Sequence, residues 1–298
     1  MRFHHLALMV LIQFIWGVNF VALKYAVMDF SPILANALRF MMVAALLLPF
    51  LKIIKGQMKA ILRVAFILGV LHFGTVMFAV AYAEGVSEVT IVAQLSVPFS
   101  TILAVFMLKE VIHWKRTLGI VISFGGVVLL GFDPRVFNHL DAVFLVMTSA
   151  LALALASIYM RRLKAVSALT IQAWVGVAGV SGSLVLSFIF ESGQIEQIVS
   201  ASNAAWGAVL FSAAASSVLG HGGLNYLFRF YEVSVVSPYM LLMPLFGVAA
   251  SVVLLDETLT ARMIWGGLIT LIGVMIITLR NQKRKLPQPG TDGASEPV

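Results

Sequence analysis

The sequence predicts an all-α integral membrane protein with ten transmembrane helices. Of its 298 residues, 61% are hydrophobic and 11% are charged, and the mean hydropathy is +1.01. Soluble globular domains have roughly 45–50% apolar and about 25% charged residues, so this composition excludes a soluble fold. Crossing a bilayer takes roughly 20 residues, and charge-poor stretches of about that length recur along the chain. We expect spans at about 5–25, 32–51, 62–82, 88–108, 114–131, 141–161, 167–190, 204–228, 234–255 and 261–280.

Short polar or proline-containing breaks separate these spans. The clusters at residues 52–56 and 161–164 are too rich in Lys and Arg to stay in hydrocarbon. Ser31-Pro32 and Asp133-Pro134 bring proline, which is favoured in loops and in the first turn of a helix. The first span follows a single Arg2 and no small-residue cleavage site, so we interpret it as a retained helix and not as a signal peptide.

Two segments, residues 83–127 and 231–274, repeat one pattern. The matching positions are Pro98 and Pro244, Leu108-Lys109-Glu110 and Leu255-Asp256-Glu257, Gly119 and Gly266, and Gly126 and Gly273. Each half holds five spans, an odd number, so equivalent helices cross in opposite directions, as in inverted-topology transporters. We expect an N-terminal half at 1–135, an inverted C-terminal half at 136–280, and a disordered cytoplasmic tail at 281–298.

The distribution of basic residues predicts the orientation. With the N-terminus inside, 16 of the 20 Lys and Arg residues fall on the cytoplasmic side, three fall on the other side, and Arg39 lies within a span. Short cytoplasmic loops carry an excess of Lys and Arg, so both termini are predicted to be cytoplasmic. The net charge of +7 is spread over these loops, which argues against nucleic-acid binding.

No motif of an enzyme or of a cofactor site is visible. The chain has no cysteine, no His-Glu-x-x-His zinc motif, no Gly-Lys-Ser/Thr phosphate loop and no Gly-x-Ser-x-Gly nucleophile elbow. No Asp or Glu falls in the middle of an expected span. We therefore predict no enzymatic activity, cofactor or metal site.

Polar residues in the middle of spans are costly in hydrocarbon and usually face the bundle interior or an aqueous cavity. His72 and His221 each lie ten residues before a tyrosine, Tyr82 and Tyr231, at matching places in the two halves. An inverted repeat would bring them together near the midplane. Two interpretations are open: the histidines line a cavity, or they only hydrogen-bond a neighbouring helix. Metal ligation is the least favoured alternative.

Three further features are assigned structural or hinge roles. Arg39 is either a counter-ion for an anionic substrate group or a structural residue that satisfies carbonyls, and the structural role is favoured. Pro98 and Pro244 remove backbone hydrogen bonds in the middle of spans and suggest a shared hinge. Gly119, Gly126, Gly266 and Gly273 recur at i, i+7 and allow helices to approach closely.

These residues, together with Trp16-Gly17-Val18-Asn19-Phe20 and Leu38-Arg39-Phe40, resemble the drug/metabolite transporter superfamily, specifically the ten-helix EamA-like exporters of bacterial inner membranes. The resemblance covers about residues 5–280 and implies a basket of two inverted five-helix halves around a central cavity. It implies as substrate-binding candidates Trp16, Asn19, His72, Tyr82, Gln94, Ser157, Tyr159, His221, Asn225 and Tyr239. Leu153 and Ser157 depart from the Trp and Asn that some relatives have in the sixth helix.

The resemblance implies a secondary transporter that exports amino acids or related small metabolites by alternating access. A broad-specificity multidrug efflux protein is the alternative, and a membrane-embedded enzyme or sensor is a remote one. The expected partners are a small-molecule substrate and the lipid bilayer, and we expect a monomer.

Overall fold

The computed structural model describes residues 2–160, 163, 166–228, 230–231 and 236–283. Throughout this part of the chain the regular secondary structure is helical. Eight helical stretches are long and apolar enough to cross a membrane: Phe3–Asp29, Met58–Tyr82, Val86–Leu108, Trp114–Gly131, Leu140–Met160, Ala168–Phe190, Asn203–Leu224 and Ala261–Leu279. Two shorter apolar helices, Pro32–Leu46 and Tyr239–Leu254, accompany them. The expected all-helical membrane protein is thereby confirmed.

Several of the long stretches consist of more than one helical segment. The first half contains α1 (Phe3–Asp29), α2 (Pro32–Leu46), η1 (Leu48–Phe50), α3 (Met58–Phe66), η2 (Ile67–His72), α4 (Phe73–Tyr82), α5 (Val86–Val92), η3 (Ala93–Leu95), α6 (Ser96–Leu108) and α7 (Trp114–Gly131). After the short α8 (Pro134–Phe137), the second half contains α9 (Leu140–Met160), α10 (Ala168–Phe190), α11 (Gln194–Ser200), α12 (Asn203–Phe211), η4 (Ser212–Gly220), α13 (His221–Phe228), η5 (Ser237–Leu241), α15 (Leu242–Leu254) and α16 (Ala261–Lys283).

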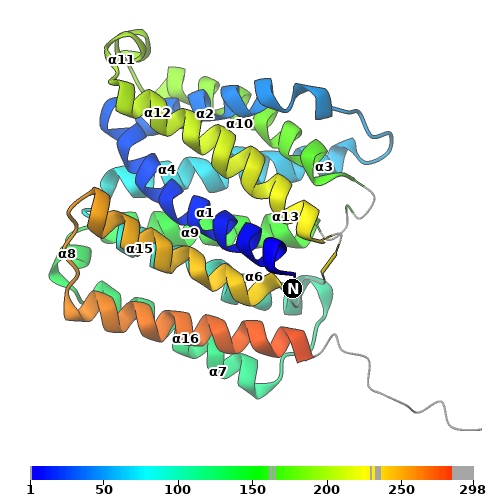
Figure 1. Ribbon diagram of the computed structural model, residues 1–298, viewed down its shortest axis with the longest axis vertical. Coiled ribbons are helices and arrows are strands. Elements are labelled where there is room, and N and C mark those ends of the chain that lie inside the picture. Colours follow the sequence, from blue (N-terminus) through cyan, green and yellow to red (C-terminus); the bar gives the residue numbers. More distant parts are fainter. Residues whose placement is uncertain (1, 161–162, 164–165, 229, 232–235, 284–298) are drawn as a thin grey trace, which may run out of the picture.

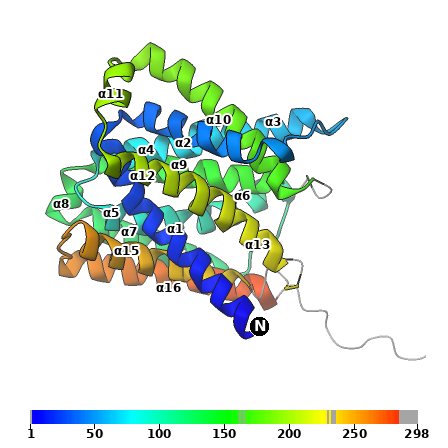
Figure 2. The same cartoon turned by 45° about the horizontal axis from the view of Figure 1, so that its top comes forward.

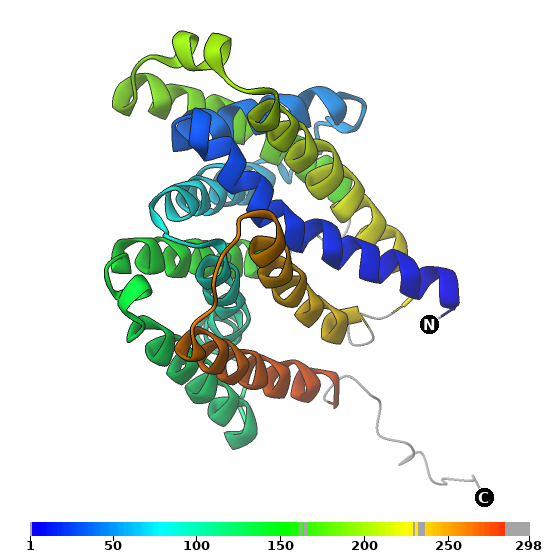
Figure 3. The ribbon, with the colours of Figure 1, turned by 60° about the vertical axis from the view of Figure 1, so that its left-hand side comes forward.

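The long helices lie side by side in one bundle. The short helices α8 and α11 lie at one end, whereas the start of α1 and the end of α16 lie at the other (Figure 1). Helix α1 runs between α12 on one side and α15 on the other (Figure 2). The pair α7 and α16 forms one edge of the bundle and the pair α2 and α10 lies towards the opposite edge (Figure 3).

Small residues allow α7 and α16 to cross in close contact. A Cβ atom added to Gly266 would lie 2.9 Å from the carbonyl oxygen of Gly126, and one added to Gly273 would lie 2.6 Å from that of Gly119. Carbon atoms do not approach oxygen so closely, so these positions accept only glycine without movement of the helices. In a bilayer, where lipid tails compete equally for apolar contact, such backbone approach is a main source of helix association.

Carboxylates cap helices of the other half at the end of the bundle that holds α8 and α11. Glu257 accepts hydrogen bonds from the backbone N–H of Val86, at 3.0 Å, and of Ser87, which begin α5. Glu191 accepts from Ile33 at 2.8 Å and from Leu34 at 2.9 Å, in the first turn of α2. The first N–H groups of a helix have no partner within it and carry a partial positive charge, so these carboxylates stabilise both helices.

The two copies of the repeat share an unusual backbone conformation. Lys109 and Asp256, at equivalent positions, are the non-glycine residues with positive φ in the described part of the chain, at 56° and 52°. After each of them the next N–H turns back, from Glu110 to the carbonyl of Ala104 and from Glu257 to that of Ser251. The same helix ending therefore occurs in both halves.

Two boundaries differ from the sequence-based expectation. Helix α2 ends at Leu46, before the expected limit near residue 51, and η1 follows it. The cause is Pro49, which has no N–H and restricts the residue before it. At the other end of the chain α16 continues to Lys283, so residues 281–283 are helical where disorder was expected. Asn281, Gln282 and Lys283 tolerate the helix, and the next proline is Pro287.

Candidate functional site

Two long helices contain a π-helical segment, and each segment leads to a histidine. In the stretch α3–η2–α4 the π segment is Ile67–His72, which ends at His72. In α12–η4–α13 it is Ser212–Gly220, which His221 follows directly. A π segment carries backbone hydrogen bonds one residue longer than those of an α-helix, and it frequently marks a functional site. The sequence predicted these two histidines as equivalent, and the structure gives both the same local setting.

Side chains from neighbouring helices satisfy carbonyls in the π segments. The Nδ2 of Asn36, in α2, donates to the carbonyl of Gly69 in η2 at 2.9 Å. The Nε1 of Trp16, in α1, donates to the carbonyl of Ser216 in η4 at 3.1 Å. A buried carbonyl without a donor is costly, so these bonds stabilise the irregular backbone.

The two histidines contact different neighbours. The Nδ1 of His72 lies 2.7 Å from the hydroxyl and 3.0 Å from the carbonyl oxygen of Ser149 in α9, and that hydroxyl also lies 3.1 Å from the carbonyl of His72. The ring of His221 packs against Trp16 of α1, with centroids 5.2 Å apart. Both histidines and Trp16 remain partly exposed although they lie within long apolar helices.

Arg39 lies between the two histidine-bearing helices. It is 1% exposed, and its Nη2 donates to the hydroxyl of Ser217 in η4 at 3.0 Å. Its guanidinium lies 4.1 Å from the centroid of the Phe73 ring, next in sequence to His72. The structure thus groups Arg39, His72, His221 and Trp16 in one region.

Pro98 and Pro244 occupy the same position in two other broken helices. Pro98 is the third residue of α6, which follows the 3-10 turn η3, and Pro244 is the third residue of α15, which follows the 3-10 turn η5. Each proline therefore lies in the first turn of a new α-helix, where its missing N–H costs little. A 3-10 turn therefore precedes each of the two prolines for which the sequence predicted a shared hinge.

The other predicted site residues differ in burial and in contacts. Asn19 and Gln94 are each 7% exposed, and the Oδ1 of Asn19 has no hydrogen-bond partner in the described part of the chain. Ser157 donates to the carbonyl of Leu153 in its own helix at 2.8 Å. Tyr239 packs against the small cluster that contains Met9. The side chain of Asn225 lies outside the described residues.

Tyr82 and Tyr159 lie away from the histidines, at opposite ends of the bundle. Tyr82 is the last residue of α4 and is 48% exposed. The ring of Tyr159 lies 5.1 Å from the guanidinium of Arg63 in α3, at the beginning of the same long stretch that Tyr82 ends. The structure therefore does not bring these two tyrosines together with the histidines.

Sequence reasoning did not single out Ser149, Ser217 or Phe73. Ser149 is 1% exposed in α9 and bonds His72, and Ser217 is 2% exposed in η4 and bonds Arg39. The pair Ser216-Ser217 was the available signal, because two adjacent hydroxyls in an apolar span need hydrogen-bond partners. Nothing in the sequence marks Phe73, because an aromatic residue is ordinary in a membrane helix.

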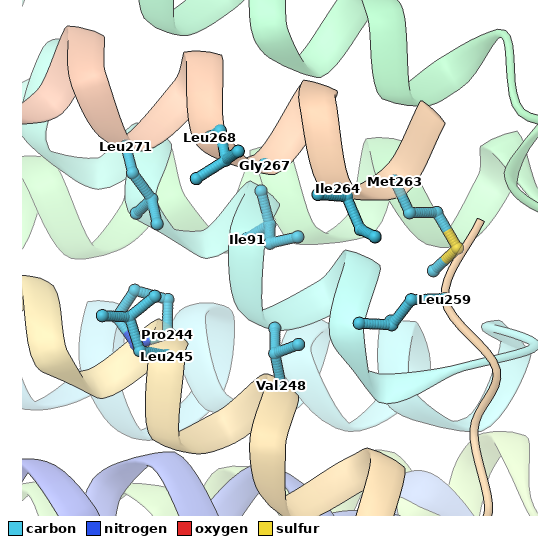
Figure 4. Close-up of a pocket in the computed structure, with 10 residues that line it drawn as sticks. All are labelled: Ile91, Pro244, Leu245, Val248, Leu259, Met263, Ile264, Gly267, Leu268 and Leu271. Carbon is cyan, nitrogen blue, oxygen red and sulfur yellow. The ribbon is translucent and has the colours of Figure 1, made fainter. Parts of the chain in front are cut away.

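A cleft of about 170 Å³ lies between α5, α15 and α16 (Figure 4). All its lining residues are apolar: Ile91, Pro244, Leu245, Val248, Leu259, Met263, Ile264, Gly267, Leu268 and Leu271. Leu245, Ile264 and Leu268 are 43–51% exposed, so the cleft opens on the outer surface of the bundle. A site for a polar metabolite needs convergent polar groups, which this cleft lacks.

The long apolar helices, with irregular segments and polar side chains inside the bundle, define a polytopic membrane transporter. The sequence pattern of the EamA-like transporter family matches residues 5–132 and again residues 140–279. The chain belongs to the EamA-like transporter family.

Individual proteins are similar over nearly the whole chain. A probable amino-acid metabolite efflux pump of Escherichia coli (strain K12) is 25% identical, over 96% of this chain and 98% of that protein. A protein of the same description from Salmonella typhimurium is 25% identical, over 91% of this chain and 93% of that protein. An uncharacterized transporter of Archaeoglobus fulgidus is 29% identical, over 88% of this chain and 94% of that protein. A solved crystal structure with 15% identity has a TM-score of 0.64 and covers 96% of this chain and 100% of that one, a likeness of fold.

Proposed function

We propose that the protein is a secondary transporter of the bacterial inner membrane that exports amino acids or related small metabolites. The observation that supports it most directly is the pair of π segments, each leading to a partly exposed histidine inside the bundle. The similar proteins described as probable amino-acid metabolite efflux pumps support the substrate class.

The proposed architecture is ten spans in two inverted halves. The helix contacts support it, because they occur in matching pairs. Helix α1 packs on α12, η4 and α15, and its counterpart α9 packs on η2, α4 and α6. Helix α2 packs on α10 and α7 packs on α16, which are pairs of counterparts. The two consecutive family matches support the same division near residue 136.

The proposed mechanism is alternating access around a site at the histidines. We infer that the broken helices bend during transport at the π segments η2 and η4 and at the 3-10 turns η3 and η5, which precede Pro98 and Pro244. Because the halves are inverted, a movement that opens one face of the bundle has a counterpart that opens the other. His72, His221 and Trp16 stay between the two entrances.

A substrate panel tests the proposed function. Reconstituted vesicles are loaded with single labelled amino acids, and efflux is compared with that from protein-free vesicles. We expect at least one amino acid to leave the vesicles down its gradient. Unlabelled substrate outside should accelerate this efflux by exchange. If cationic dyes are exported and no amino acid competes with them, the protein is a multidrug efflux protein instead.

A further inference from the structure

Arg39 is a buried cation whose hydrogen-bonding groups are only partly satisfied. Its Nη2 donates to Ser217, but its Nε and Nη1 have no hydrogen-bond partner in the described part of the chain. The rings of Phe73 and Phe40 lie 4.1 Å and 5.2 Å from the guanidinium carbon. Aromatic faces attract a cation but do not accept all of its N–H groups.

Among the residues that the structure describes, no carboxylate pairs with Arg39. Arg135 and Glu84 form an ion pair at 3.8 Å, but it lies away from Arg39 and both of its side chains are about half exposed. A buried ion without a counter-ion is expensive in a medium of low dielectric constant. The bundle interior at Arg39 therefore holds a positive charge that no carboxylate of the described residues neutralises.

The position of this charge relates it to the site. Asn36, one turn before Arg39 in α2, bonds the π segment η2 through Gly69, whereas Arg39 bonds the π segment η4 through Ser217. Phe73, which lies against the guanidinium, follows His72 directly. Helix α2 thus contacts both broken helices, and its one charge lies against Ser217 of one and Phe73 of the other.

We propose that Arg39 recognises an anionic group of the substrate, and that this group is the carboxylate of an amino acid. This inference rests on the proposed function and deepens it. In the conformation described here the guanidinium is sealed from solvent, so its charge acts through the low-dielectric interior on a carboxylate that meets the partly exposed histidines. When η2 and η4 shift, the Nε and Nη1 groups become available to donate directly.

The first arm of the test uses the wild-type protein and matched pairs of solutes. Unlabelled L-leucine, L-phenylalanine and L-cysteine, and their decarboxylated amines 3-methylbutylamine, 2-phenylethylamine and cysteamine, compete with efflux of a labelled amino acid from vesicles. A hydrogen bond to a charged group corresponds to a difference of about tenfold or more in affinity, so we expect each recognised amino acid to inhibit at least about tenfold better than its amine. Equal inhibition overturns the inference and leaves the proposed function standing.

The second arm assigns the preference to Arg39. In Arg39→Gln the preference for the amino acid over its amine should fall to about threefold or less. Arg39→Lys keeps the charge but not the planar donor geometry, so the preference should remain but weaken. Arg135→Gln, at the bundle end, is the control and should keep the full preference. An unchanged preference in folded Arg39→Gln overturns the inference. If that variant does not fold, Arg39→Lys and the wild-type arm decide. Absence of any amino-acid efflux overturns the proposed function and this inference with it.

Discussion

At the scale of single residues, the two histidines have equivalent backbone settings but different contacts. His72 is held by Ser149 through its ring nitrogen and its carbonyl, whereas His221 has the Trp16 ring as its neighbour. A ring held by hydrogen bonds to Ser149 has less freedom to reorient towards a solute. His221 is therefore the more adaptable member of the pair.

We expect His72→Ala and His221→Ala each to fold and to reduce transport. Loss of one hydrogen bond to the substrate corresponds to roughly a 3- to 10-fold decrease. His72→Ala should also lower stability by about 0.5–1.5 kcal/mol, because it loses the bond to Ser149. The measurements are efflux per folded molecule and the melting temperature in detergent.

His139, between α8 and α9 at the end of the bundle, provides the control, and His139→Ala should change neither quantity. If both central variants melt at lower temperature while efflux per folded molecule is unchanged, the histidines only pack. The substrate site would then have to lie elsewhere in the bundle.

At the scale of helices, irregular segments and close crossings have separate roles. The π segments η2 and η4 and the 3-10 turns η3 and η5 occur in the helices that contain the histidines and the two equivalent prolines, whereas α7 and α16 are continuous. The continuous pair is joined by glycines and packs at one edge of the bundle. The regular edge can hold the two halves together while the broken helices change shape.

Gly126 and Gly125 provide a matched test of that crossing. A Cβ on Gly126 would collide with Thr270 and with the carbonyl of Gly266, at 2.6 Å, whereas one on Gly125 would meet no atom within 4 Å. Overpacking typically costs about 1–3 kcal/mol, so Gly126→Ala should melt several degrees lower. Gly125→Ala should melt like the wild type or slightly higher, because alanine favours the helix. Equal melting temperatures would contradict the close crossing.

At the scale of the whole molecule, the two ends of the bundle differ in charge. The end with α8 and α11 carries capping carboxylates such as Glu191 and Glu257. The other end holds the beginning of α1 and the loop before α3, where Lys52 and Lys55 lie. Since basic loops remain in the cytoplasm, the second end is the cytoplasmic one in our proposal.

Reporter fusions test this orientation. A reporter fused after Lys55, Arg116 or Lys164 should be active as a cytoplasmic protein. Fusions near Asp133 and Gly193, at the carboxylate-rich end, should report the periplasm. A periplasmic signal from the fusion after Lys164 would reverse the proposed orientation of that loop.

The sequence by itself determined the membrane class, the helical content and the histidine-bearing helices, because each depends on properties of single residues in water and in lipid. Hydropathy places apolar stretches in the bilayer, and the cost of a buried polar group singles out His72, His221 and Arg39. No neighbour needs to be known for either inference.

Only the tertiary structure decided where the helices break and which side chains meet. A π segment needs donors from other helices, here Asn36 and Trp16, and local sequence does not reveal that they lie beside Gly69 and Ser216. The isolation of the Arg39 charge is likewise a property of the packed bundle, since it depends on which oxygen atoms come within reach of its nitrogens. Hydrogen bonds between distant segments form only when the chain has folded, and so they are absent from any pattern read along it.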